Sequence, residues 1–77
     1  MPTIFLVGGL KVQVFADDHH PPHFHITGPE IQVLVRIDDL SILHGERHRR
    51  QVRDVLAWAD GNRDILWTAW AQLNDER

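Results

Sequence analysis

The chain has 77 residues, of which 43% are hydrophobic and 25% are charged, and its net charge is −3 when histidine is neutral. A chain of this length is expected to form a single domain, residues 1–77, with a small core, because such domains bury only about 60% of the surface that the unfolded chain exposes. The composition excludes several classes of protein: there is no cysteine for disulfides or thiolate metal sites, no basic excess for a general nucleic-acid coat, and no apolar run near the roughly 20 residues of a membrane span.

The first half of the chain shows the alternation of apolar and polar residues that is typical of half-buried strands. The N-terminal residues alternate in this way and lack the basic segment of a secretory signal, so we predict a strand there and a cytoplasmic protein. Turn residues follow at Gly8–Gly9 and Gly28–Pro29. These connections are too short for parallel crossovers, so the sequence predicts an antiparallel β-meander of four to five strands. The later strands are expected at residues 10–16, 23–27, 31–37 and 40–44.

The second half repeats apolar residues at helical spacing, in two stripes. Between the stripes, Gly61 is suited to end the first helix and Asn62 to cap the second. With so short a connection, the two segments should form an α-helical hairpin packed on one sheet face, which gives an α+β fold. Trp58 and Trp70 are expected in the core, whereas Trp67 lies outside the stripes and could anchor an interface. The stripes are Val52, Val55, Leu56 and Ala59, followed by Leu66, Ala69, Trp70 and Leu73.

Helices on one face leave the other face of the sheet open to solvent or to a partner. The alternation places two apolar residues there, Phe15 and Leu34. The polar residues expected on the same face are Lys11, Gln13, Gln32 and Arg36.

The segment DDHHPPHFH, residues 17–25, holds four of the six histidines of the chain. In an extended chain alternate residues point the same way, so we expect Phe24 and Ile26 to face the core, and His23 and His25 to project outward. The two prolines hold the preceding residues in extended conformations, which makes the turn stiff. A preorganised site requires such rigidity, although a stiff turn also has purely structural uses.

Three kinds of chemistry fit this segment, and the sequence leaves all three open. A zinc or nickel ion would accept imidazole and carboxylate ligands. Without a metal, His19, His23 and His25 could act as general acid and base while an arginine holds a phosphodiester. Alternatively, the imidazoles cap the turn, pair with Asp17 and Asp18, and contact a partner protein. The candidate metal ligands are Asp18, His19, His23 and His25.

The run RHRRQVR, residues 47–53, concentrates four arginines at or before the start of the first predicted helix. The helix dipole disfavours cations at this position, so the cluster suggests an anionic partner such as a carboxylate patch, a phosphate or a nucleic acid. A solvated helix face is the alternative interpretation. The candidate binding residues are Arg50 and Arg53, together with Arg36 from the open sheet face.

Three stretches resemble a family of small bacterial proteins, catalogued as domain of unknown function 4160. They are MPTI at the start, DHHPPHFH at residues 18–25 and VLAWA at residues 55–59. The second stretch fits the family pattern D/N-H-x-P-P-H-F-H, which is unusual enough to be fairly specific. The resemblance extends from Met1 to about Leu73, which is nearly the whole chain.

The resemblance also ranks the candidate residues. The family pattern is free at the position of His20, so it favours the other three histidines of the motif. Family members often carry Leu-Pro where this chain has Arg47 and His48, whereas Arg50 and Arg53 match arginines of the family's helix.

The resemblance implies an α+β fold, a bacterial and cytoplasmic setting, and a companion encoded by an adjacent gene, as in toxin–antitoxin pairs. The family has no agreed biochemical activity. The leading hypothesis is a small protein-interaction module that binds this companion or a second copy of itself. The alternatives are a small histidine-dependent phosphodiesterase or ribonuclease, and a histidine-rich metal-binding regulator.

Overall fold

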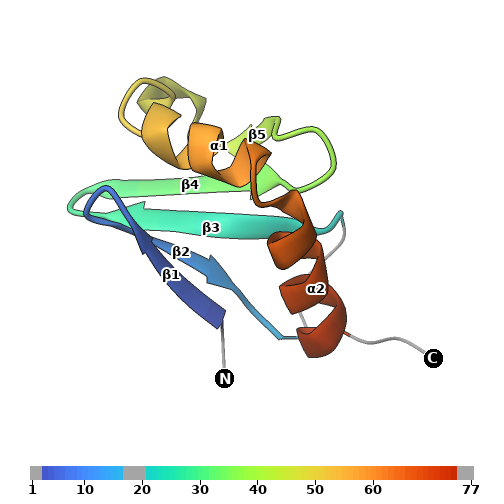
Figure 1. The fold of residues 1–77 in the computed structure, drawn as a ribbon. Helices are drawn as coiled ribbons and strands as arrows, with labels where there is room; N and C mark the ends of the chain where they lie inside the picture. Colours follow the sequence, from blue (N-terminus) through green and yellow to red (C-terminus); the bar gives the residue numbers. More distant parts are fainter. Residues whose placement is uncertain (1–2, 17–20, 75–77) are drawn as a thin grey trace.

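The computed structural model describes residues 3–16 and 21–74 and confirms the α+β fold (Figure 1). Five antiparallel strands form one sheet in the order β1-β2-β3-β4-β5, so each strand lies beside the next one in the chain. A short 3-10 helix, η1, and two α-helices follow. The elements are β1 (Thr3–Val7), β2 (Leu10–Val14), β3 (His23–Gly28), β4 (Ile31–Arg36), β5 (Ile42–His44), η1 (Glu46–His48), α1 (Arg53–Asp60) and α2 (Arg63–Leu73).

Tight turns explain the meander. Gly8–Gly9 has positive φ at both residues, 58° and 81°, the backbone that two-residue hairpins favour because it matches the twist of the flanking strands. Between β3 and β4, Glu30 takes a φ of 58° directly after Pro29, as in a turn with proline at its first central position. Leu40 has a φ of 61° and bends the chain after β4. Because of this bend, β5 begins at residue 42 and is shorter than the strand that the sequence predicts.

The core lies between one face of the sheet and the two helices. Alternate strand residues and the two helical stripes meet there, as predicted, with α1 against β1 and α2 against β2. Each fully buried Val, Leu, Ile or Phe stabilises the fold by about 1.5–3 kcal/mol relative to an exposed side chain. The buried apolar residues are Val12, Val14, Phe24, Ile26, Val33, Val35, Ile37, Val52, Val55, Ala59, Leu66, Ala69 and Trp70.

The helix connection differs from the prediction in one respect. Asn62 occupies the position before α2, but its side chain makes no capping hydrogen bond to that helix. Its amide instead donates to the carbonyl oxygen of Trp58 at 2.8 Å, a second bond to a carbonyl that also accepts from the N–H of Gly61 at the end of α1. In Figure 1, α2 then runs past the end of the sheet where β3 begins. After α2, the Asn74 side chain donates to the carbonyl oxygen of Phe15 at 2.8 Å and ties this helix to the end of β2.

Candidate functional site

The sheet face opposite the core is the first candidate surface. We call it the open face, because both described α-helices pack against the core face. Of its described residues, His23 alone is buried, and Leu6 is 76% exposed. The strand register places on this face Leu6, Lys11, Gln13, His23, His25, Thr27, Gln32, Leu34, Arg36 and His44. Phe15, which follows β2, joins this face through the contact of its ring with His25.

The two histidines at the start of β3 differ in exposure. The side chain of His23 is only 5% exposed, and its ring centroid lies 5.5 Å from that of Trp70 on α2. His25 is half-buried, with its ring 5.1 Å from the His23 ring and in edge-on contact with Phe15 at 4.7 Å. His23 therefore lies on the open face by register, as predicted, but Trp70 covers its ring, so the imidazole is not exposed to solvent as that prediction implied. We call this group, His23, His25, Phe15 and Trp70, the histidine end.

The placement of α2 explains the burial of His23. The pairing of β2 with β3 ends at Gln13 and His25, so the start of β3 extends beyond β2. The last turns of α2 reach this point, because Asn74 is bonded to the backbone at the end of β2. Trp70 then packs against the His23 ring, and alternation along one strand does not reveal this contact.

A hydrogen bond to a backbone carbonyl fixes the tautomer of the His23 ring. Its ring nitrogen Nδ1 lies 2.7 Å from the carbonyl oxygen of Pro21. A carbonyl oxygen only accepts, so Nδ1 carries the proton, and the lone pair of the neutral ring is on Nε2. This tautomer suits an imidazole that acts as a base or as a metal ligand through Nε2. The stiff proline segment therefore orients one predicted histidine.

The predicted metal set is divided between described and undescribed residues. Asp18 and His19 lie outside the described residues, whereas His23 and His25 lie side by side. Within residues 3–16 and 21–74, no group of three or more histidine, aspartate or glutamate side chains is arranged to hold a metal ion. A zinc or nickel site formed by Asp18, His19, His23 and His25 therefore stays a prediction.

The candidate arginines lie in two places. Arg36 is directly across from His23 in the β3–β4 register and is 3.7 Å from the carboxylate of Asp38. Arg50 and Arg53 are exposed at the approach to α1. In Figure 1 this part of the chain lies at the opposite end of the molecule from the start of β3. The structure thus brings Arg36 to the histidine end, but not Arg50 or Arg53.

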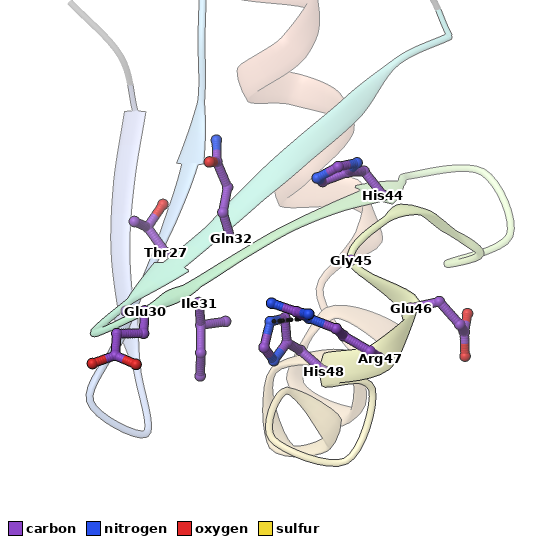
Figure 2. Close-up of a pocket in the computed structure, with 10 residues that line it drawn as sticks. Thr27, Glu30, Ile31, Gln32, His44, Gly45, Glu46, Arg47 and His48 are labelled. Atoms are coloured by element: carbon purple, nitrogen blue, oxygen red, sulfur yellow. Dashed lines mark hydrogen bonds between the residues drawn. The ribbon is translucent and has the colours of Figure 1, made fainter.

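A groove that the sequence did not predict lies at the other end of β3 (Figure 2). Its volume is about 710 Å³, and it separates the β3–β4 turn from the segment that follows β5. Gly45 forms the bend of that segment, with a φ of 89°. A Cβ atom at this position would lie 2.6 Å from the carbonyl oxygen of Gln32, so glycine allows the segment to approach β4 closely. The groove is lined by Thr27, Gly28, Glu30, Ile31, Gln32, His44, Gly45, Glu46, Arg47 and His48.

Charges around the groove are arranged unevenly. Arg47 donates from Nε to Nε2 of His48 at 3.3 Å, and the two side chains point toward each other in Figure 2. Glu46 points away and accepts from Arg49 at 2.9 Å. This hydrogen bond lowers the pKa of Glu46 and raises that of Arg49. The groove is therefore lined by a guanidinium, two imidazoles and the carboxylate of Glu30, while the Glu46 carboxylate points away and is paired with Arg49.

Sequence reasoning missed this groove because its walls come from segments about 15 residues apart, and no local pattern joins them. The available signal was Gly45, a lone glycine between a strand and a basic run. A glycine in that position indicates a left-handed bend or a close approach of two backbones.

Comparison with known proteins identifies the family of the chain. The model of the family described as a domain of unknown function (DUF4160) matches residues 9–71, which include the proline–histidine motif and most of both helices. No curated protein and no solved structure matched the chain. In the described part of the chain, no helix has the length and apolar character needed to cross a membrane.

Proposed function

We propose that this chain, which belongs to the DUF4160 family, is a small bacterial protein-interaction module and one component of a toxin–antitoxin-like pair. The proposed partner is a small protein encoded by an adjacent gene. The observation that carries the proposal is the open face, a sheet surface without a described helix across it that combines apolar, aromatic and cationic side chains.

The composition of the open face supports a protein partner. Leu6 is exposed at its edge, while Leu34 is half-buried nearer its centre and Phe15 is half-buried at the histidine end. A partner that covers such apolar and aromatic side chains removes their surface from water, which favours association. The solvent-facing side of an antiparallel sheet is mostly polar, so several apolar and aromatic side chains on one such face favour a partner there.

The charge of the open face defines the partner further. Lys11 and Arg36 are its cations, and its described strand residues include no aspartate or glutamate. The chain as a whole is acidic, with a net charge of −3, so this absence is a local property. An acidic partner surface would complement the face, and its association would weaken as salt is added.

Co-purification tests the proposal. The chain and the product of the adjacent gene should form a complex when they are expressed together. Leu34→Glu places a carboxylate at the centre of the open face, opposite His25 and His44, and should weaken the complex at least about tenfold because the proposed acidic partner surface repels it. The binding is measured by calorimetry at two salt concentrations.

Trp67→Glu is the matched control. Trp67 is 40% exposed on α2, on the helical side of the molecule, and its replacement should leave the complex unchanged. Failure of the chain to bind the product of the adjacent gene would contradict the proposal. An equal loss of affinity in Leu34→Glu and Trp67→Glu would contradict it as well.

A second candidate function is supported by the histidine end. His23 has a fixed tautomer, His25 lies beside it, and Arg36 is across from it with an Nε atom that is buried without a hydrogen-bond partner among the described residues. Two imidazoles and a guanidinium are the groups that a metal-free phosphodiesterase or ribonuclease needs.

Turnover of single-stranded RNA and of an activated phosphodiester, in the presence of a chelator, tests this alternative. His25→Ala should abolish the activity, while Gln13→Ala, across from His25 on β2, should retain it. If neither substrate is turned over by the wild-type chain, the enzymatic alternative is wrong.

A further inference from the structure

The two edges of the sheet differ in how they are protected against pairing with another strand. The β5 edge has three residues and a register irregularity opposite Leu34 and Val35. Short, irregular edges resist strand addition. The β1 edge has five residues, TIFLV, in regular register with β2, and contains no charge, no proline and no glycine. Sequence features that normally block edge pairing are therefore absent from β1.

The register shows which backbone groups of β1 point outward. Val7 and Leu10 flank the two-residue turn, so they form a hydrogen-bonded pair, and the pairing alternates from there. Phe5 consequently bonds to β2, whereas the N–H and C=O groups of Ile4 and Leu6 point away from the sheet. Among the described residues no strand lies on that side, because β1 ends the strand order.

A groove runs along the same edge on the core side. It has a volume of about 300 Å³ between Phe5 and one flank of α2. Ile65, on that flank, is 42% exposed, and Leu6 is 76% exposed on the other side of the strand. The groove is also lined by the polar side chains of Asp64, Thr68 and Gln72. A strand added at this edge would cover part of the apolar side chains of Leu6 and Ile65 on its two sides.

We propose that the occupant of this edge is the β1 strand of a second copy of this chain. An uncharged strand pairs antiparallel with itself around a two-fold axis, the commonest symmetry of protein dimers. An axis through Phe5 pairs Leu6 of each copy with the partner's Ile4 and joins the two sheets through about four main-chain hydrogen bonds. The proposal concerns the main-chain edge of β1 and does not depend on the proposed binding of an adjacent-gene product by the open face, although Leu6 borders both surfaces.

Sedimentation equilibrium of the whole chain tests the proposal. The wild type should have twice the chain mass of 8.9 kDa. Leu6→Pro removes an outward N–H without removing a bond to β2, and Ile65→Lys places a charge at the groove. Each change should raise the dimer dissociation constant at least about tenfold, because every interface group is lost twice in a two-fold dimer.

Trp67→Lys is the matched control, because Trp67 lies on the same helix with nearly the same exposure, 40%, and does not line the groove. It should leave the dimer intact. Circular dichroism checks that each variant is folded, and Ile65→Lys tests the interface if Leu6→Pro does not fold. A monomeric wild type at millimolar concentration would overturn the proposal, as would a dimer equally sensitive to Trp67→Lys.

Cysteine cross-linking tests the register. The chain has no native cysteine, and Phe5 faces itself across a non-hydrogen-bonded pair, where Cα atoms are about 4.5 Å apart and a disulfide can form. Under mild oxidation, Phe5→Cys should form a covalent dimer, whereas Leu43→Cys, 44% exposed on the opposite edge strand, should not. Cross-linking of Leu43→Cys alone would place the interface at β5 and contradict the proposal.

Discussion

His23, at the start of β3, is 5% exposed and packs against Trp70, whereas His44, on β5, is exposed and lines the groove beyond the other end of β3. Both residues belong to the open face by register, yet one ring is held by a helix and the other is available to a ligand. The comparison teaches that strand alternation assigns a face, while the path of a distant helix decides exposure. At the histidine end the fold depends on the packing of the His23 ring against Trp70. At the groove it depends on the backbone bend at Gly45.

The largest expected effect is at the groove, where Gly45 permits the close approach to β4. Gly45→Ala should destabilise the fold by about 2–3 kcal/mol, because its φ is 89° and the new Cβ would meet the Gln32 carbonyl at 2.6 Å. Gly61→Ala is the control, because Gly61 has a φ of −88° and its nearest contact would be at 3.8 Å. Urea denaturation measures both variants, and equal destabilisation would contradict the importance of the bend.

The second effect is at the histidine end. His23→Ala should reduce the free energy of unfolding by about 2 kcal/mol, since it removes the contact with Trp70 and the hydrogen bond to Pro21. His44→Ala, at the exposed position of the comparison, should change it by less than about 0.5 kcal/mol. Urea denaturation of the two variants under identical conditions gives the difference, and a smaller loss for His23 than for His44 would reverse our interpretation of the two regions.

The smallest effect concerns pH. The hydrogen bond from Arg49 lowers the pKa of Glu46 below its ordinary value of 4.5 in the folded chain. The pair therefore contributes stability above the unfolded pKa of Glu46 and loses it as the pH falls through the folded pKa. Because both partners are exposed, we expect only a slight change in the free energy of unfolding. An NMR titration should find a midpoint below 4.5 that moves up in Arg49→Gln. If the midpoint is the same in both proteins, Arg49 does not lower the pKa of Glu46, and the pair has no effect on stability.

Much of the fold follows from local patterns in the sequence. Period-two alternation predicted the strands and the core positions such as Phe24 and Ile26, and helical spacing predicted the buried stripes of α1 and α2. The family resemblance is confirmed over residues 9–71. Trp67, which fell outside the helical stripes, is partly exposed, while Trp70 is buried.

The remaining features depend on contacts between distant segments. His23 is buried by Trp70, which lies 47 positions later in the chain, so no pattern within residues 17–25 contains that information. The groove exists because Gly45 allows the η1 segment to approach β4 closely. The hydrogen bond from the Asn62 side chain back to α1 depends on how the two helices are oriented, which helical spacing does not give. Sequence periodicity predicts which residues face the core, but these features depend on how whole elements are packed together.

The proposed role of the open face is tested most directly by NMR cross-saturation in the complex with the adjacent-gene product. We predict transfer to backbone amides across the open face, including Gln13, Leu34 and His44, and little transfer to the exposed residues of α2. Transfer centred on Ile65 and Trp67 instead, with the amides of β2 and β4 unaffected, would contradict the account.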